Sequence, residues 1–217
     1  FHSIDARFRL YGGSRGPGKT KALVMEAMWL GATYPGTEIV IGRRDFSDLE
    51  KTTLSEFLRS CPPELYQPPG QYHRTKHTMT WVNGSKFYFM ELKDPESLLS
   101  ANLGAVFIDE AVEVPRLTFA NAVGCLRISP EHRIANMRLL GIPEEDARAQ
   151  VESSEPIKYY CCLASNPGPG WVKELFVDNS ELAADGSYRT QDGFVFIPGR
   201  IADNQENLPD DYAEQLA

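Results

Sequence analysis

The feature that most constrains this chain is a glycine-rich octapeptide near its start, Gly13–Thr20 (GSRGPGKT). It fits the pattern G-x(4)-G-K-[ST]. A strand-like run over residues 7–12 precedes it, and helical spacing of apolar residues over 19–34 follows. Glycines let backbone N–H groups curl around a polyphosphate, and a helix start favours an anion. We therefore predict a phosphate-binding loop between a strand and a helix, in preference to a glycine-rich turn that merely caps a helix.

The loop supplies both side-chain and backbone candidates for nucleotide binding. Lys19 is expected to reach the β- and γ-phosphates, where it would act in catalysis, and the Thr20 hydroxyl is expected to bind Mg²⁺. The other candidate nucleotide-binding positions are Gly13, Ser14, Arg15, Gly16, Pro17 and Gly18.

An acidic pair, Asp109 and Glu110, follows a second apolar run at residues 105–108. Asp109 would hold Mg²⁺, and Glu110 would polarise the attacking water as a catalytic residue. On its own such a pair would fit a helix start, because acids there suit the helix dipole. Together with the upstream loop it predicts a hydrolytic site. It also separates the chain from small GTPases, whose water is oriented by a glutamine.

A third polar segment, Ser165-Asn166-Pro167-Gly168, follows the apolar run 157–164. At a strand end beside the nucleotide, Asn166 could bind near the γ-phosphate and report its loss. A turn made by Asn-Pro-Gly explains the same residues. The stretch by itself leaves both interpretations open.

Short apolar runs separated by helical stretches predict an α/β fold, with a mostly parallel central sheet flanked by helices. Asn83-Gly84 between two strand-like runs predicts an added β-hairpin, and Asp192-Gly193 predicts another. Met25 and Trp29, on the apolar side of the first helix, are expected in the core. The polar residues 128–156 are expected to form a surface insertion with a helix around 144–151.

Composition narrows the function classes. The net charge of −8 excludes a domain that binds nucleic acid with a uniformly basic surface, but it is compatible with a local basic patch. No apolar run approaches the roughly 18 residues of a membrane span, so no membrane partner is expected. The four cysteines lack CxxC spacing, which favours buried thiols over a zinc site or a disulfide framework.

Several segments together resemble the ATPase domain of the large terminase subunit, the DNA-packaging motor of tailed phages. The matching pieces are GGSRGPGKT, GRRDFSDLEKTTLSEF, VFIDEA, LASNPGPGW and a tail close to D-N-x-x-L-P-x-x-Y. The likeness covers nearly the whole chain. The loop and the acidic pair are shared by many ATPases, so the family assignment depends on the tail and the arginines of the second segment.

The resemblance implies that residues 1–217 form a single P-loop NTPase domain of the additional-strand (ASCE, RecA-like) type. ATP and Mg²⁺ would be its ligands, and ATP hydrolysis would drive double-stranded DNA into a procapsid. The implied partners are the portal protein, the small terminase subunit and further copies in a homo-oligomeric ring, while the isolated domain can be a monomer. The implied location is the portal in the host cytoplasm. The nuclease domain that follows in the family is absent from this chain.

The resemblance also implies roles for arginines and for the third segment. Arg15 would act as a catalytic sensor of the nucleotide state, and Ser165 with Asn166 would form the coupling motif. Many relatives carry an arginine finger shortly before the acidic strand, but here that stretch reads SLLSANLGAV. Our candidate for a finger that acts on the neighbouring subunit is therefore Arg127, with Arg133 and Arg138 as alternatives.

Other interpretations remain at this stage. Arg43 and Arg44 would contact the nucleotide, track DNA or be solvated charges at a helix start. A helicase-like, nucleic-acid-dependent ATPase is disfavoured, because the chain has no room for a second lobe of about 150 residues. A nucleotide-binding interaction module with little turnover is disfavoured by Glu110. For the isolated domain we expect weak, salt-sensitive DNA binding.

Overall fold

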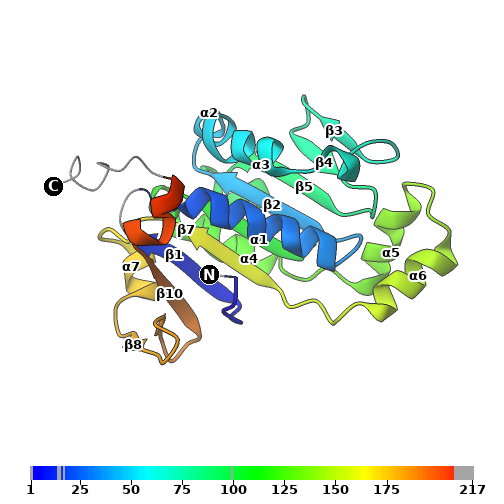
Figure 1. Ribbon diagram of the computed structural model, residues 1–217. Helices are drawn as coiled ribbons and strands as arrows, with labels where there is room; N and C mark the ends of the chain where they lie inside the picture. Colours follow the sequence, from blue (N-terminus) through cyan, green and yellow to red (C-terminus); the bar gives the residue numbers. More distant parts are fainter. Residues whose placement is uncertain (1, 14–15, 17, 99, 208–217) are drawn as a thin grey trace.

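A ten-stranded mixed sheet, in the order β3-β4-β5-β2-β6-β7-β1-β10-β9-β8, runs through the molecule (Figure 1). The computed structural model describes residues 2–13, 16, 18–98 and 100–207. Ser14, Arg15 and Pro17 of the predicted phosphate loop therefore lie outside the described residues, as does the end of the tail, residues 208–217.

Six parallel strands form the centre of the sheet, and an antiparallel hairpin extends each edge. β7 lies between β1 and β6. It is the additional strand after which this class of P-loop fold is named. The strands are β1 (Phe8–Gly13), β2 (Glu38–Arg43), β3 (Gln71–His73), β4 (Thr78–Thr80), β5 (Lys86–Glu91), β6 (Ala105–Asp109), β7 (Tyr160–Ala164), β8 (Glu181–Leu182), β9 (Tyr188–Arg189) and β10 (Phe194–Gly199).

Helices cover both faces of the sheet, as the sequence predicts. Alternation along the strands divides the core in two. Ile39 and Ile41 pack with α1 (Lys19–Thr33) and α3 (Ser55–Ser60). Val40 points to the other face, where the core includes residues of α4 (Arg116–Gly124) and α7 (Trp171–Phe176). The predicted α/β fold with a mostly parallel sheet is confirmed.

The helical stretch after β2 is continuous but changes from α- to π-helical winding and back. It consists of α2 (Phe46–Leu49), a π-helical segment (Glu50–Leu54) and α3. A π-helix adds one residue to a turn, and such segments occur frequently at functional sites. Short 3₁₀ segments complete the described elements, at Pro63–Leu65, Pro95–Leu98, Ala111–Glu113 and Ile201–Asn207.

Both predicted hairpins are present. Asn83-Gly84 lies in the connection between β4 and β5, whose register pairs Thr80 with Lys86. Gly84 has φ 83°, which suits glycine in such a turn. Gly193, with φ 82°, lies between β9 and β10, which pair Arg189 with Val195.

Residues 128–156 hold two helices, α5 (Pro130–Arg138) and α6 (Glu144–Ser153), where the sequence predicts only the second. The Ser129 hydroxyl caps α5 by accepting from the His132 N–H at 3.2 Å. Both helices lie together at one end of the molecule (Figure 1). They share a small apolar cluster of Ile134, Met137, Ala147 and Val151, with Ile142 packed against it.

One core assignment was wrong. Met25 and Trp29 are 42% and 52% exposed, so they lie on the solvent side of α1. The cause is that α1 is apolar on nearly every side. Its buried face is made instead by Leu23, Val24, Ala27, Met28 and Leu30.

The four cysteines are buried free thiols, as predicted. None of the described helices is both long enough and apolar enough to span a membrane.

Candidate active site

Described residues from all three predicted motifs line a cavity of about 660 Å³ at the carboxyl ends of the central strands. Parallel strands all end at the same edge of a sheet, so the loops after β1, β2, β6 and β7 converge there. The lining residues are Gly16, Gly18, Lys19, Thr20, Lys21, Arg43, Glu110, Glu113, Asn166 and Asn204.

The described part of the phosphate loop has the backbone that its glycines predict. Gly13 and Gly18 have φ values of 130° and 76°, where a side chain would be strained. At Gly13 a Cβ would also lie 2.4 Å from the Gly199 carbonyl oxygen, so the loop packs tightly on β10. No described side chain caps the N-terminus of α1 at Gly18. Its backbone N–H groups thus suit a phosphate.

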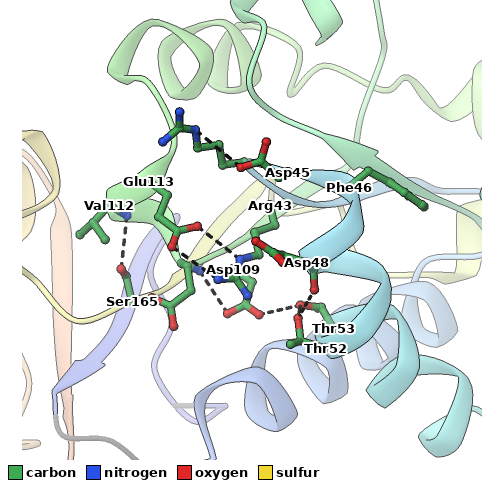
Figure 2. A network of polar contacts seen from close by, with 12 residues as sticks. Arg43, Asp45, Phe46, Asp48, Thr52, Thr53, Asp109, Val112, Glu113 and Ser165 are labelled. Carbon is green, nitrogen blue, oxygen red and sulfur yellow. Dashed lines mark hydrogen bonds and ion pairs between the residues drawn. The ribbon is translucent and has the colours of Figure 1, made fainter.

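Asp109 ends β6 as a buried carboxylate held by three donors, and Figure 2 shows its contact with Thr53. The Thr53 hydroxyl donates to Oδ2 at 2.6 Å, and the Thr20 hydroxyl donates to the same oxygen at 3.2 Å. The Glu110 N–H donates to Oδ1 at 3.2 Å. Sequence reasoning missed Thr53, whose hydroxyl reaches Asp109 from the π-helical segment.

The oxygens of Asp109 and Thr20 fit Mg²⁺, a hard cation that prefers oxygen ligands. Magnesium keeps several waters and takes substrate phosphates, so it needs few protein ligands. The described residues contain no group of three or more His, Cys, Asp or Glu side chains arranged to hold a metal.

Glu110 is the first residue after β6 and adopts a left-handed conformation, with φ 48° and ψ 54°. This backbone turn takes it off the strand, and its side chain lines the cavity. Burial and the neighbouring Asp109 carboxylate raise the pKa of Glu110, while Lys19 and Arg43 oppose that shift. Such a half-buried carboxylate has the setting of a general base.

The third segment contacts both earlier motifs. The Lys19 ammonium donates to Asn166 Oδ1 at 2.8 Å, so the end of β7 contacts the phosphate loop directly. The buried Ser165 hydroxyl accepts from the Val112 N–H at 3.3 Å, just after the acidic pair (Figure 2). These contacts distinguish the segment from a bare turn, which would not need either side chain.

Three further residues that line the cavity, Lys21, Glu113 and Asn204, were not assigned to the site from the sequence. Asn204, from the 3₁₀ segment Ile201–Asn207, donates to the Gly16 carbonyl at 2.7 Å. The D-N-x-x-L-P tail was the available signal, but nothing in it indicates that the segment folds back over the loop. Glu113 lies one turn after the acidic pair and forms an ion pair with Arg43 at 3.4 Å.

The three finger candidates lie elsewhere. The Arg127 N–H bonds to Leu103, six residues before Asp109 along the chain, which corresponds to about 20 Å of strand. Arg127 is exposed there, so it could act only on a neighbouring copy. Arg133 is buried, with its guanidinium donating to the Pro35 carbonyl and to Ser154, and Arg138 forms an ion pair with Glu144.

Comparisons with known proteins agree on one family. A family model described as phage terminase large subunit matches residues 5–216. The large terminase of a thermophilic bacteriophage, in complex with ATP-γ-S, superposes with a TM-score of 0.68 at 16% identity. That match covers 98% of this chain and 44% of the thermophilic phage protein. A comparison with curated protein sequences finds no match.

The ATPase domain of the Thermus phage P74-26 large terminase superposes with a TM-score of 0.61 at 18% identity. That match covers 99% of this chain and 84% of the Thermus phage domain. Both structures share the fold, and this chain spans less than half the length of the first terminase. Because the family model matches nearly the whole length of this chain, the chain belongs to the phage terminase large-subunit family.

Proposed function

We propose that this chain binds ATP with Mg²⁺ and hydrolyses it, as the ATPase motor of a phage DNA-packaging machine. The observation that carries the proposal is that Lys19, Thr20 and Glu110 line one cavity, with the buried Asp109 carboxylate bonded to the Thr20 hydroxyl beside it. The large terminase of the thermophilic bacteriophage, which has the same fold, is described in complexes with ATP-γ-S and with ADP, and this supports a nucleotide as the ligand.

Each side chain has a distinct task in this scheme. Lys19 exchanges its contact with Asn166 for the phosphates. Thr20 and Asp109 hold Mg²⁺, which when bound neutralises charge on the phosphates. The Glu110 carboxylate orients the water and accepts its proton as the water oxygen bonds to the γ-phosphorus and the bond to ADP breaks. Arg15 keeps its proposed role as a sensor.

Ser165 and Asn166 supply a route from the nucleotide to the rest of the motor. Asn166 contacts Lys19, and Ser165 contacts the backbone of Val112. Loss of the γ-phosphate would therefore change the contacts of the segments that follow β7 and β6. Double-stranded DNA, the portal protein, the small terminase subunit and a ring of further copies in the host cell are the proposed partners. In such a ring the exposed Arg127 would face a neighbour's nucleotide.

The first test is steady-state ATP hydrolysis against protein concentration, with and without duplex DNA, for the wild type and Glu110→Gln. The variant should bind ATP normally but hydrolyse it about 10²- to 10⁴-fold more slowly, because the base is lost. Normal turnover by Glu110→Gln would refute its assignment as the base. Binding without turnover by the wild type, even at high concentration, would favour a nucleotide-gated interaction module.

A rate per subunit that rises with concentration would support an arginine supplied by a neighbour, since such a residue is worth about 10³- to 10⁵-fold. Arg127→Ala should then abolish that rise. A rise that survives in Arg127→Ala would move the finger to another residue.

A further inference from the structure

Arg43 brings a further cation into the active-site cavity from the end of β2, beside Lys19 and Lys21. The register places Gly42 of β2 opposite Ile108 of β6. Arg43, the last residue of β2, therefore lies level with Asp109, the last residue of β6. Its side chain is only 16% exposed, and it lines the cavity with Lys19 and Glu110. This arginine therefore belongs to the nucleotide site of its own chain rather than to the solvated surface.

The present partner of Arg43 is a loose one. Its Nε and Nη2 atoms each lie 3.4 Å from a carboxylate oxygen of Glu113, whose side chain is 38% exposed. Charge-assisted hydrogen bonds between such groups are normally about 2.7–2.9 Å long. A phosphate offers the same paired oxygens with more charge, and the planar guanidinium fork matches it. Glu113 is thus a partner that a nucleotide can displace.

The negative charge of nearby carboxylates also favours a cation at the position of Arg43. Glu113 contacts the Arg43 guanidinium, and the charges of Asp109 and Glu110 also act on it. Burial disfavours its charge, but the Glu113 contact and the other two carboxylates outweigh this and raise the pKa of Arg43. The arginine therefore stays charged while the γ-phosphate would arrive beside these acids.

We propose that Arg43 is a catalytic residue of its own subunit. It gives up its contact with Glu113 and binds the terminal phosphate of ATP as negative charge develops there during hydrolysis. This deepens the proposed function and rests on it. Arg43 neither gains nor loses a proton: the water proton goes to Glu110, the bond between the γ-phosphorus and ADP breaks, and the guanidinium neutralises the oxygens of the transferred group.

The neighbouring arginine offers a matched control. Arg44 is half exposed, and its Nε lies 3.8 Å from Asp45, outside the residues that line the cavity. A general effect of removing positive charge from the end of β2 should appear in both variants. An effect of contact with the nucleotide should appear in Arg43→Ala alone.

The experiment compares single-turnover ATP hydrolysis and the affinities for ATP, ADP and ADP with aluminium fluoride, an analogue of the transition state. Arg43→Ala should lower the hydrolysis rate by about 10²-fold or more and change ATP affinity by less than about tenfold. The preference for ADP with aluminium fluoride over ADP should fall by a similar factor. Arg44→Ala should stay within about twofold of the wild type in every measurement, and melting curves confirm that each variant folds.

Glu113→Gln separates catalysis from a purely structural ion pair. Releasing Arg43 should raise the hydrolysis rate by up to about fivefold, the strength of a partly exposed pair. If Glu113→Gln instead loses as much activity as Arg43→Ala, the pair is structural and the proposal is overturned. Unchanged hydrolysis and analogue preference in Arg43→Ala overturn it too. A wild type that neither hydrolyses ATP nor prefers the analogue refutes the proposed function itself.

Discussion

At the residue scale, Thr53 is the side chain that sets the position of the Asp109 carboxylate. Its hydroxyl contact is 2.6 Å long and fully buried, whereas the Thr20 contact on the same oxygen is 3.2 Å. If Thr20 turned toward a bound Mg²⁺, as the proposed function requires, the Thr53 hydroxyl would still hold Asp109. It is therefore a positioning residue that acts through the carboxylate.

Thr53→Val should weaken the apparent affinity for Mg²⁺ in ATP hydrolysis by about 10- to 100-fold, the usual effect of losing a partner of a metal ligand. Thr53→Ser keeps the hydroxyl and should restore most of it. Thr52→Val is the control for loss of a neighbouring hydroxyl: Thr52 is exposed, and its hydroxyl bonds to the Asp48 carbonyl and lies 3.3 Å from the Thr53 hydroxyl. A magnesium titration in which Thr53→Val and Thr52→Val behave alike would contradict this role.

Site residues that lie directly after a strand could be predicted from the sequence. Site residues that reach the cavity only because a distant segment folds back onto it could not. Lys19, Asp109 and Asn166 could be placed together because parallel strands share a carboxyl edge. Thr53 could not, since its direction depends on the π-helical turn before it. Asn204 could not either, because its contact with the loop joins residues 188 apart in sequence.

At the scale of elements, the same distinction holds. Long periodic segments such as α1 and the strand runs were predicted closely, because their pattern repeats. The exposed side of α1 was misjudged, since a helix that is apolar all round carries no preferred face in its sequence. α5 was missed because its anchoring is tertiary: at Gly36 and Gly84 a Cβ would lie 2.2 Å from the Arg133 carbonyl oxygen and 2.8 Å from Met137 Cγ.

The 3₁₀ segment Ile201–Asn207 covers the phosphate loop through one side chain. Asn204→Ala removes the bond to the Gly16 carbonyl, and a net hydrogen bond is worth about 0.5–1.5 kcal/mol. We expect nucleotide affinity to fall by about two- to tenfold in equilibrium titration. Glu206→Ala, an exposed change in the same segment, should leave the affinity unaltered. Equal losses in both variants would show that the segment matters only through its overall stability.

At the scale of the whole molecule, a buried ion pair joins the two elements that flank the phosphate loop. Arg9 on β1 donates to Glu26 on α1 at 2.6 Å, and both side chains are at most 2% exposed. Burial alone would raise the pKa of Glu26, but the hydrogen bond from His2 and the charge of Arg9 outweigh it and lower the pKa. The pair therefore stabilises the fold above the unfolded-state pKa of about 4.3, and this contribution is lost as pH falls through the lower folded-state value.

Arg9→Met leaves Glu26 buried without its main cation and should cost about 3–5 kcal/mol at neutral pH. Urea unfolding of both proteins from pH 7 to pH 4 should show the difference shrinking toward acid, because protonation relieves the stranded carboxylate in the variant. Arg9→Met with Glu26→Gln should recover part of the loss at pH 7. A difference that does not vary with pH would mean that Glu26 is not charged in the folded protein.

The burial of every cysteine has a practical consequence. Burial raises the pKa of Cys162 to about 12 and that of Cys61 to about 11, and Cys125 and Cys161 are likewise enclosed. Maleimide dyes react with accessible thiolates, so the folded chain behaves as though it had no cysteine. One cysteine introduced at Leu139, which is 84% exposed beside α5, would take a fluorophore with the native thiols left in place. The fluorescence of such a labelled protein, recorded with and without ATP, would then report whether the α5–α6 pair moves when nucleotide is added.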